Sequence, residues 1–372
     1  MKNLENIKDE FYSFPKNYQG NYQSFIEELL EEYLKRLPDF DSWLADDIRS
    51  NKDKIESLCE AINSSIDLYL NGLTAQAYKK LKSALDSIKD FMLYPKPDKI
   101  LLAGGNKLSY FRIRESFNNV DKSGIFHIPF QLRHLTSSQR YSIPGVPCLY
   151  LSNSLHLCWE ELGRPTNKRL FAARFEIDRN TWNIINISYT PLKIVNLYNK
   201  MDYESEHSIC KFFLRSTLLT WPLIVACSIR KKLTNADFSV EYIIPQLLLQ
   251  WALENKDIDG IAYYSNRSWY TDFMEKPLYQ ENLAIPVKTN LEYGLCTELK
   301  KKTPFTDVIK ISAYKYLRNL ELRKEDIDVW IEKNMVSRLN QFGRSFITKE
   351  KSPTVFDRVE IELLKKEPVV LT

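Results

Sequence analysis

The stretch "LYLSNSLHLCWEELG", residues 149–163, reads as a short apolar strand, a serine-bearing turn and the first turns of a helix. Its later apolar residues recur three or four positions apart, at Leu155, Cys158, Trp159 and Leu162. This spacing predicts a helix that begins near Ser154 and buries one face. At about 100° per residue, Glu160 points away from that face and Glu161 lies nearer its edge. Two such acids also suit a solvated position in the first turns of a helix, so this stretch leaves their role open.

The composition predicts a globular, soluble protein. The 372 residues are 44% hydrophobic and 13% aromatic, which supplies a sizeable core for two or three units. A net charge of +4 is too small over this length to indicate nucleic acid or an anionic membrane as a partner. The six cysteines form neither a close-spaced metal pattern nor a dense disulfide framework, which fits a reducing compartment. The N-terminus lacks an apolar signal core, and the longest apolar stretch is interrupted by Pro222, so we expect a cytoplasmic location.

Glycine-rich phosphate-binding patterns are absent from the sequence. Only ten glycines occur in 372 residues, and no strand-like run is followed by G-x-G-x-x-G or by G-x-x-x-x-G-K-S/T. A nucleotide bound by this chain would therefore have its phosphates held by arginine side chains rather than by a glycine-rich main chain.

Hydrophobic patterning divides the chain into three segments. Residues 1–97 have apolar positions three or four apart and predict an all-α domain, which ends at the prolines of "YPKPDK". Residues 98–312 alternate short strand-like runs with helical patterns and predict an α+β unit around a largely buried sheet. These strands are spaced too irregularly for a doubly wound array. Residues 313–372 are charged and predict a helical C-terminal extension.

Polar side chains at the ends of the predicted strands form a complementary set. Arg112 and Arg114 in "YFRIR" project to one face because strand side chains alternate. The others are Arg140 and Tyr141 in "SSQRYS", Tyr150 in "LYLS", and Ser265, Asn266 and Arg267 in "IAYYSNRS". Together with a carboxylate, these groups would suit cleavage of a nucleotide's glycosidic bond. Taken singly, each also fits an ordinary position, such as a surface arginine, a core tyrosine or a turn serine.

The order and spacing of these motifs resemble the RES domain, a family named for its arginine, glutamate and serine. The resemblance rests on "YFRIR", "RYSIPGVPCLYLS", "CWEEL" and "DGIAYYS" and extends over about residues 105–312. The segments "YIIPQLLLQWALENKDIDGIAYYS" and "LAIPVKTNLEYGLCTEL" are similar to the part of the family that leads into the serine and to its closing strand. Residues 1–97 resemble the HEPN-like helical domain that precedes RES in longer members.

The resemblance implies a fold related to ADP-ribosyltransferases and an enzyme that consumes NAD⁺, usually as the toxin of a toxin–antitoxin pair. The family's arginine, glutamate and serine match Arg112, Glu161 and Ser265, and its second arginine and its tyrosine match Arg140 and Tyr150. Glu160 is the other candidate for the glutamate, and Tyr141 and Arg114 join the expected substrate-binding set. Compact toxin members lack the N-terminal helices and the C-terminal extension. The toxin role, an antitoxin or other regulatory partner, and a homo-oligomer therefore stay open.

The implied reaction passes through an oxocarbenium-like transition state at the nicotinamide ribose. We expect Glu161 to stabilise its charge, Ser265 to position the ribose and Tyr150 to pack along the ligand. Arg112 and Arg140 would bind the pyrophosphate, or inorganic phosphate as a co-substrate. We expect NAD⁺ as substrate and no metal or other cofactor, because the leaving group is already cationic. The histidines at positions 127, 134, 156 and 207 show no ligand spacing, and His127 is expected to be structural.

Two functions from other classes remain open at this stage. The same site would suit an ADP-ribosyltransferase that attaches the ribose to a protein target. A degenerate RES unit would instead bind a nucleotide as a non-catalytic sensor.

Overall fold

The N-terminal part of the chain is helical. The computed structural model describes residues 7, 10–37, 43–93, 106–165, 169–198, 204–232, 236–267, 280–311 and 355–371. In these residues, the short 3-10 turn η2 (Glu10–Tyr12) precedes α1 (Tyr22–Arg36), α2 (Trp43–Ser50), α3 (Lys52–Leu70) and α4 (Thr74–Met92). Helix α1 begins where the Asn21 side chain accepts a hydrogen bond from the Ser24 N–H (3.1 Å), which satisfies one free donor of the first turn.

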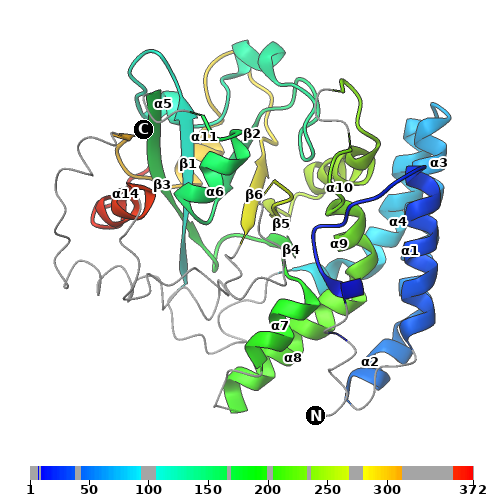
Figure 1. The fold of residues 1–372 in the computed structure, drawn as a ribbon. Coiled ribbons are helices and arrows are strands. Elements are labelled where there is room, and N and C mark those ends of the chain that lie inside the picture. The colour runs from blue at the N-terminus through cyan, green and yellow to red at the C-terminus, as the bar shows by residue number, and fades with distance from the viewer. Residues whose placement is uncertain are drawn as a thin grey trace.

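A seven-stranded mixed sheet follows these helices, with spatial order β4-β5-β6-β2-β1-β3-β7 (Figure 1). Its strands are β1 (Lys107–Glu115), β2 (Cys148–Ser152), β3 (Leu170–Asp178), β4 (Ile184–Ile187), β5 (Gly260–Tyr264), β6 (Glu281–Pro286) and β7 (Ile309–Ile311). Only β4 and β5 are paired in parallel among these strands. A parallel pair needs a long crossover, which here contains α7 (Pro191–Tyr198), α8 (Glu204–Leu219), α9 (Trp221–Cys227), η7 (Val240–Tyr242) and α10 (Ile243–Glu254). The predicted α+β class, with helices before the sheet, is confirmed.

The two faces of the sheet are covered by different elements. On one face, Leu149, Leu151 and Leu283 pack beneath α5 (Lys122–Ile125), η5 (Phe130–Leu135) and α11 (Thr297–Lys302). On the other face, α6 (Leu155–Glu161) and α14 (Val355–Leu364) cover the β1 and β3 side around Phe111. The β4 and β5 side of that face lies under α8–α10. A seam between these two apolar groups therefore runs across the middle of the sheet.

One hydrophobic cluster joins the N-terminal helices to the crossover helices and the sheet. Figure 1 places α9 and α10 between the N-terminal helices and the strands. Trp221 of α9 is fully buried and stacks on Phe11 (ring centroids 4.9 Å apart) and on Tyr33 (4.4 Å). The main chain of Lys16 pairs with that of Ile229. The chain around residue 97 lies outside the described residues, so the division of the chain there remains a prediction.

Helix α6 begins as predicted and buries the predicted residues Leu155 and Cys158, but Glu160 and Leu162 depart from the prediction. Its N-cap is Ser154, whose side chain accepts from the Leu157 N–H (3.1 Å). Glu160, expected to point to solvent, is 5% exposed, and Leu162, expected in the core, is 45% exposed. The helix ends at Glu161, and Leu162 is its C-cap residue. Arg164, in a left-handed conformation with φ of 61°, turns back to form an ion pair with Glu160 (2.8 Å), and this pairing makes its burial tolerable.

No single described helix is long and apolar enough to cross a membrane. Residues Cys210–Leu219 of α8 and Trp221–Cys227 of α9 reach that length and apolar content only as a pair, and the two are bent by 71° at their junction.

Candidate active site

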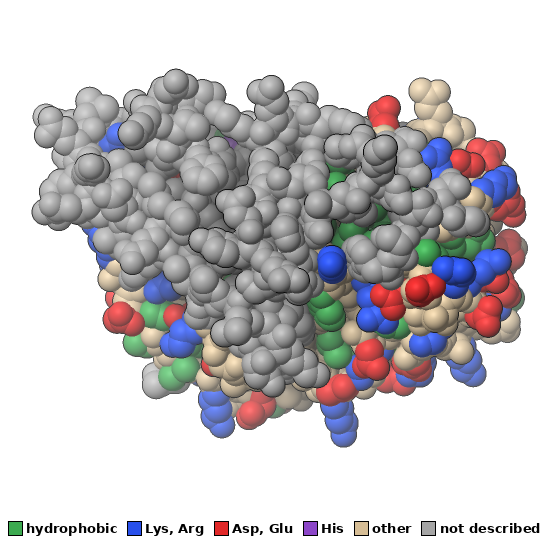
Figure 2. Space-filling model, turned by 90° about the horizontal axis from the view of Figure 1, so that it is seen from below, with side chains coloured by type: hydrophobic (Ala, Val, Ile, Leu, Met, Phe, Trp, Pro, Cys, Tyr) green, Lys and Arg blue, Asp and Glu red, His purple; other side chains and the backbone are tan. Residues whose placement is uncertain are grey.

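A pocket of about 870 Å³ opens at the seam between α6 and the loops beside α9 and α10. Its cationic side chains are Arg112, Arg140, Arg164, Arg230, Lys231 and Arg267, and its carboxylates are Glu160 and Glu161. On the face shown in Figure 2, the described basic and acidic side chains are interspersed. The pocket instead concentrates positive charge in a concave site, which favours an anionic ligand.

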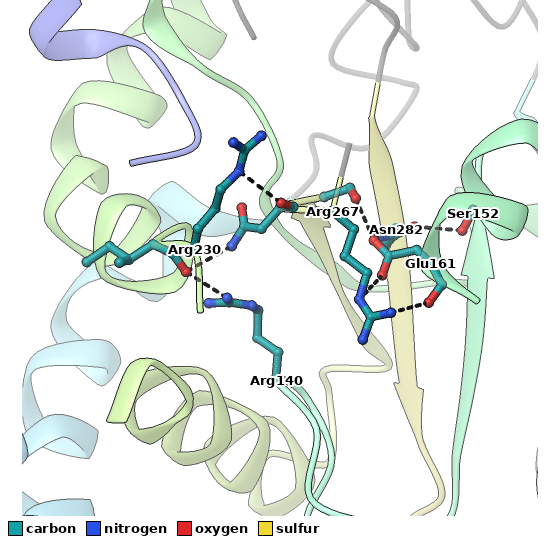
Figure 3. Close-up of polar contacts among 9 residues, drawn as sticks. Arg140, Ser152, Glu161, Arg230, Arg267 and Asn282 are labelled. Atoms are coloured by element: carbon teal, nitrogen blue, oxygen red, sulfur yellow. Dashed lines mark hydrogen bonds and ion pairs between the residues drawn. The ribbon is translucent and has the colours of Figure 1, made fainter. Parts of the chain in front are cut away.

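Glu161 is held in this pocket by donors from three other positions in the chain (Figure 3). Its Oε1 accepts from the Ser265 hydroxyl (2.5 Å) and from Asn282 Nδ2 (2.6 Å). Arg267 donates Nη1 to the Glu161 main-chain oxygen (2.9 Å) and brings Nε to 3.7 Å from Oε2. Ser265 and Asn282 are buried, whereas the Glu161 side chain is 30% exposed. Glu161 is therefore a fixed carboxylate with one side toward the pocket.

Arg112 lies where β1 leaves β2. The two strands pair at Phe111 opposite Ser152, and Arg112 Nη1 donates to the Tyr150 carbonyl (2.8 Å). Its Nε is buried and has no hydrogen-bond partner among the described residues. Burial, and to a smaller extent the charge of Arg114, lowers the pKa of Arg112. An anionic ligand that pairs with Arg112 would offset both effects.

Arg114 does not join Arg112 in the pocket, although the two were expected to share one face. Its guanidinium donates to the Gly124 carbonyl in the short helix α5, and its side chain is exposed. Alternation along a strand sets the direction in which a side chain leaves the main chain. The guanidinium at the end of a long arginine side chain can still turn toward a nearby hydrogen-bond acceptor.

Arg140 is bound mainly to main-chain oxygens. Its Nη1 donates to the Cys227 carbonyl (3.0 Å) and its Nη2 to the Ile229 carbonyl (2.7 Å). Its guanidinium also lies 5.1 Å from the centre of the Tyr242 ring. Arg140 thus contributes charge to the pocket wall while its donors hold that wall together.

Tyrosines form the apolar part of the pocket. The Tyr150 hydroxyl donates to the Tyr141 carbonyl (2.5 Å), and the Tyr141 ring lies 4.1 Å, centre to centre, from the Tyr263 ring. Burial raises the pKa of Tyr141, Tyr150 and Tyr263 well above the ordinary range, so all three are neutral phenols. They offer aromatic surface to a planar ligand group.

His127 lies outside the pocket. Its ring is fully buried, its Nε2 accepts from the Cys296 N–H (2.9 Å), and its Nδ1 lies 2.8 Å from the Ile128 carbonyl. Among the described residues, no group of three or more His, Cys, Asp or Glu side chains is placed to hold a metal ion.

The pocket also contains residues outside the sequence-based set. Asn282 follows Gln280 and Glu281 directly before the apolar run "LAIPV", so no local pattern singles it out. Arg230 and Lys231 come from the loop after α9, and no local pattern places them in the same pocket as Glu161. The structure brings Arg112, Arg140, Tyr141, Tyr150 and Glu161 together at the pocket, with Ser265 directly beneath Glu161.

The chain is similar in sequence to a protein described as a putative toxin. The chain is 34% identical over 311 residues to "Putative toxin YopC" of Bacillus subtilis (strain 168), a match that covers 81% of this chain. The two proteins are homologous, and the chain spans 66% of the relative's length, just under two thirds. No family model matches the chain, and no solved structure matches it significantly. The protein is therefore related to a putative toxin.

Proposed function

We propose that this protein is a RES-type toxin or defence effector that cleaves the nicotinamide–ribose bond of NAD⁺, with a catalytic fold related to ADP-ribosyltransferases. The observation that carries the proposal is Glu161, a carboxylate fixed at the wall of a pocket rich in arginine. Homology to a putative toxin supports the biological role. The motif series that resembles RES supports the reaction.

The carboxylate supplies what the transition state needs. As the nicotinamide leaves, positive charge develops on the ribose, and a negative group beside the sugar stabilises it. Glu161 takes this role because one of its oxygens is held by two donors while the side chain still faces the pocket. Ser265, which is fully buried and bonded to the same oxygen, would position the ribose through Glu161.

The arginines and tyrosines suit the rest of the dinucleotide. Arg112, whose Nε has no partner among the described residues, would bind a phosphate oxygen, whereas Arg140 would act through its charge because its donors bind carbonyls. The rings of Tyr141, Tyr150 and Tyr263 provide a surface for a planar base.

Inorganic phosphate is the proposed acceptor of the ribose. A neutral water is a poor nucleophile unless a base activates it, whereas phosphate arrives as an anion and suits the cationic pocket. No histidine lines the described part of the pocket, and the carboxylate best placed there, Glu161, is assigned to the oxocarbenium charge. Phosphorolysis would leave ADP-ribose with a new phosphate on the nicotinamide-side ribose.

Turnover of NAD⁺ by the purified full-length protein tests this function. We expect nicotinamide release without added metal, a rate that rises with phosphate concentration, and a phosphorylated ADP-ribose by mass spectrometry. If the product is unmodified ADP-ribose and the rate does not depend on phosphate concentration, the reaction is hydrolysis rather than phosphorolysis. Label transferred from NAD⁺ to a protein would indicate an ADP-ribosyltransferase. If the protein is folded and NAD⁺ is unchanged, the remaining alternative is a non-catalytic sensor that binds a nucleotide.

A further inference from the structure

Three strands place a row of side chains under α6. Ser152 of β2 lies opposite Asn282 of β6, and Asn282 lies opposite Tyr263 of β5. Directly opposed residues of antiparallel strands project to the same face, so the three side chains form neighbours across the sheet. Glu161, at the end of α6, meets this row from above through Asn282.

Asn282 is a buried polar side chain at the point where β6 becomes apolar. It is 1% exposed, and the residues that follow it in β6, Leu283 and Ala284, are fully buried. A buried carboxamide is costly unless both its oxygen and its nitrogen have partners. Here Oδ1 accepts from the Ser152 hydroxyl (2.6 Å) and Nδ2 donates to Glu161 Oε1 (2.6 Å).

The direction of these hydrogen bonds is fixed by their chemistry. An ionised carboxylate only accepts, so Asn282 must turn its nitrogen toward Glu161 and its oxygen toward Ser152. The Ser152 hydroxyl then donates to that oxygen and keeps the carboxamide in this orientation. Ser265 occupies the same Oε1 from the other side.

We infer that Asn282 is a positioning residue, oriented by Ser152, that fixes Glu161 so that Oε2 is the oxygen presented to the substrate. The inference rests on the proposed function, because it names which Glu161 oxygen meets the ribose. Oε1 has two short hydrogen bonds, whereas Oε2 has, among the described residues, an ion pair with Arg267 at 3.7 Å, on a half-exposed side chain. Asn282 itself acts only through Glu161.

Three variants separate this role from a general contribution to the fold. Asn282→Leu keeps the size and branching of the side chain but removes both hydrogen bonds, and we expect kcat to fall roughly 30- to 100-fold with the KM for NAD⁺ within about threefold. Ser152→Ala is the milder change, with an expected loss of roughly fivefold. In the Asn282→Leu background, Ser152→Ala should add nothing, because its effect passes through Asn282.

Asn282→Asp tests the role through the pH dependence of kcat, which should not change if Asn282 only supports the fold. It sets a second carboxylate against Glu161, and two carboxylates at that distance share a proton. The acid limb of its kcat profile should therefore move to higher pH than in the wild type. Wild-type kcat and an unchanged pH profile in the Asn282 variants would overturn the inference, as would independent effects of Ser152→Ala and Asn282→Leu.

A crystal structure of Asn282→Leu decides the matter apart from activity. We expect the Glu161 carboxylate to rotate away from the position it has beside Ser265. A Glu161 carboxylate that stays in place would overturn the inference even if NAD⁺ is turned over. If the wild type proves inactive on NAD⁺, the proposed function fails, and the position of Glu161 still decides whether Asn282 orients it.

Discussion

Lowering the pH from 7.5 to 5 is expected to destabilise the fold through His127. Burial, opposed in part by the hydrogen bond to Ile128, lowers the pKa of this ring to about 4. In the unfolded chain the ring titrates near the ordinary histidine pKa of about 6.5. Between these two pKa values, the ring is mostly protonated in the unfolded state and mostly neutral in the folded state. Stability contributed by the neutral ring is therefore complete above about pH 6.5 and is lost as the pH falls toward 4.

The size of the effect follows from the same two values. At pH 5, about 1.5 pH units below the ordinary pKa, the loss is about 2 kcal/mol at about 1.4 kcal/mol per pH unit. The assay is urea unfolding at pH 7.5 and pH 5 for the wild type, His127→Gln and His134→Gln. The first variant should lose about 2 kcal/mol less than the wild type on acidification. The second is the control, because His134 is exposed and should leave the wild-type difference unchanged.

Equal pH dependence in the wild type and His127→Gln would refute this reasoning. It would mean that the folded protein accepts a proton on the ring near the ordinary pKa. That outcome requires Nε2 to give up the hydrogen bond from the Cys296 N–H, since a protonated ring nitrogen cannot accept.

Two further predictions concern the acid pair and the sheet. Glu161→Gln should lower the rate of NAD⁺ cleavage by roughly 10²-fold or more with little change in melting temperature. Glu160→Gln should leave the rate within a few-fold but lower the melting temperature by a few degrees, because it breaks the buried pair with Arg164; the reverse pattern would move the role to Glu160. Gly260→Ala should destabilise the fold by about 1–3 kcal/mol in urea unfolding, because its Cβ would lie 3.0 Å from the Ala284 carbonyl oxygen, and an unchanged midpoint would contradict that crowding.

Local patterns predicted what depends on neighbours in sequence. The N-cap at Ser154 and the α+β order follow from spacing within short windows. The packing of α14 on α6 does not, because α14 is formed by residues 355–364, far along the chain. The partner of Glu161 was equally hidden, since Asn282 reaches it only through the pairing of β2 with β6. Such contacts arise from the topology, which short-range periodicity does not contain.

The stack of Trp221 between the N-terminal aromatic rings bears on how this protein could have diversified. Phe11 and Tyr33 cover a side chain that belongs to the crossover of the sheet, and the same cluster reaches the strands behind the pocket. A descendant that lost these helices would expose that apolar surface to water. Loss of the N-terminal helices in evolution would therefore require matching polar substitutions on α9 and α10, so the two parts should change together rather than be exchanged as independent modules.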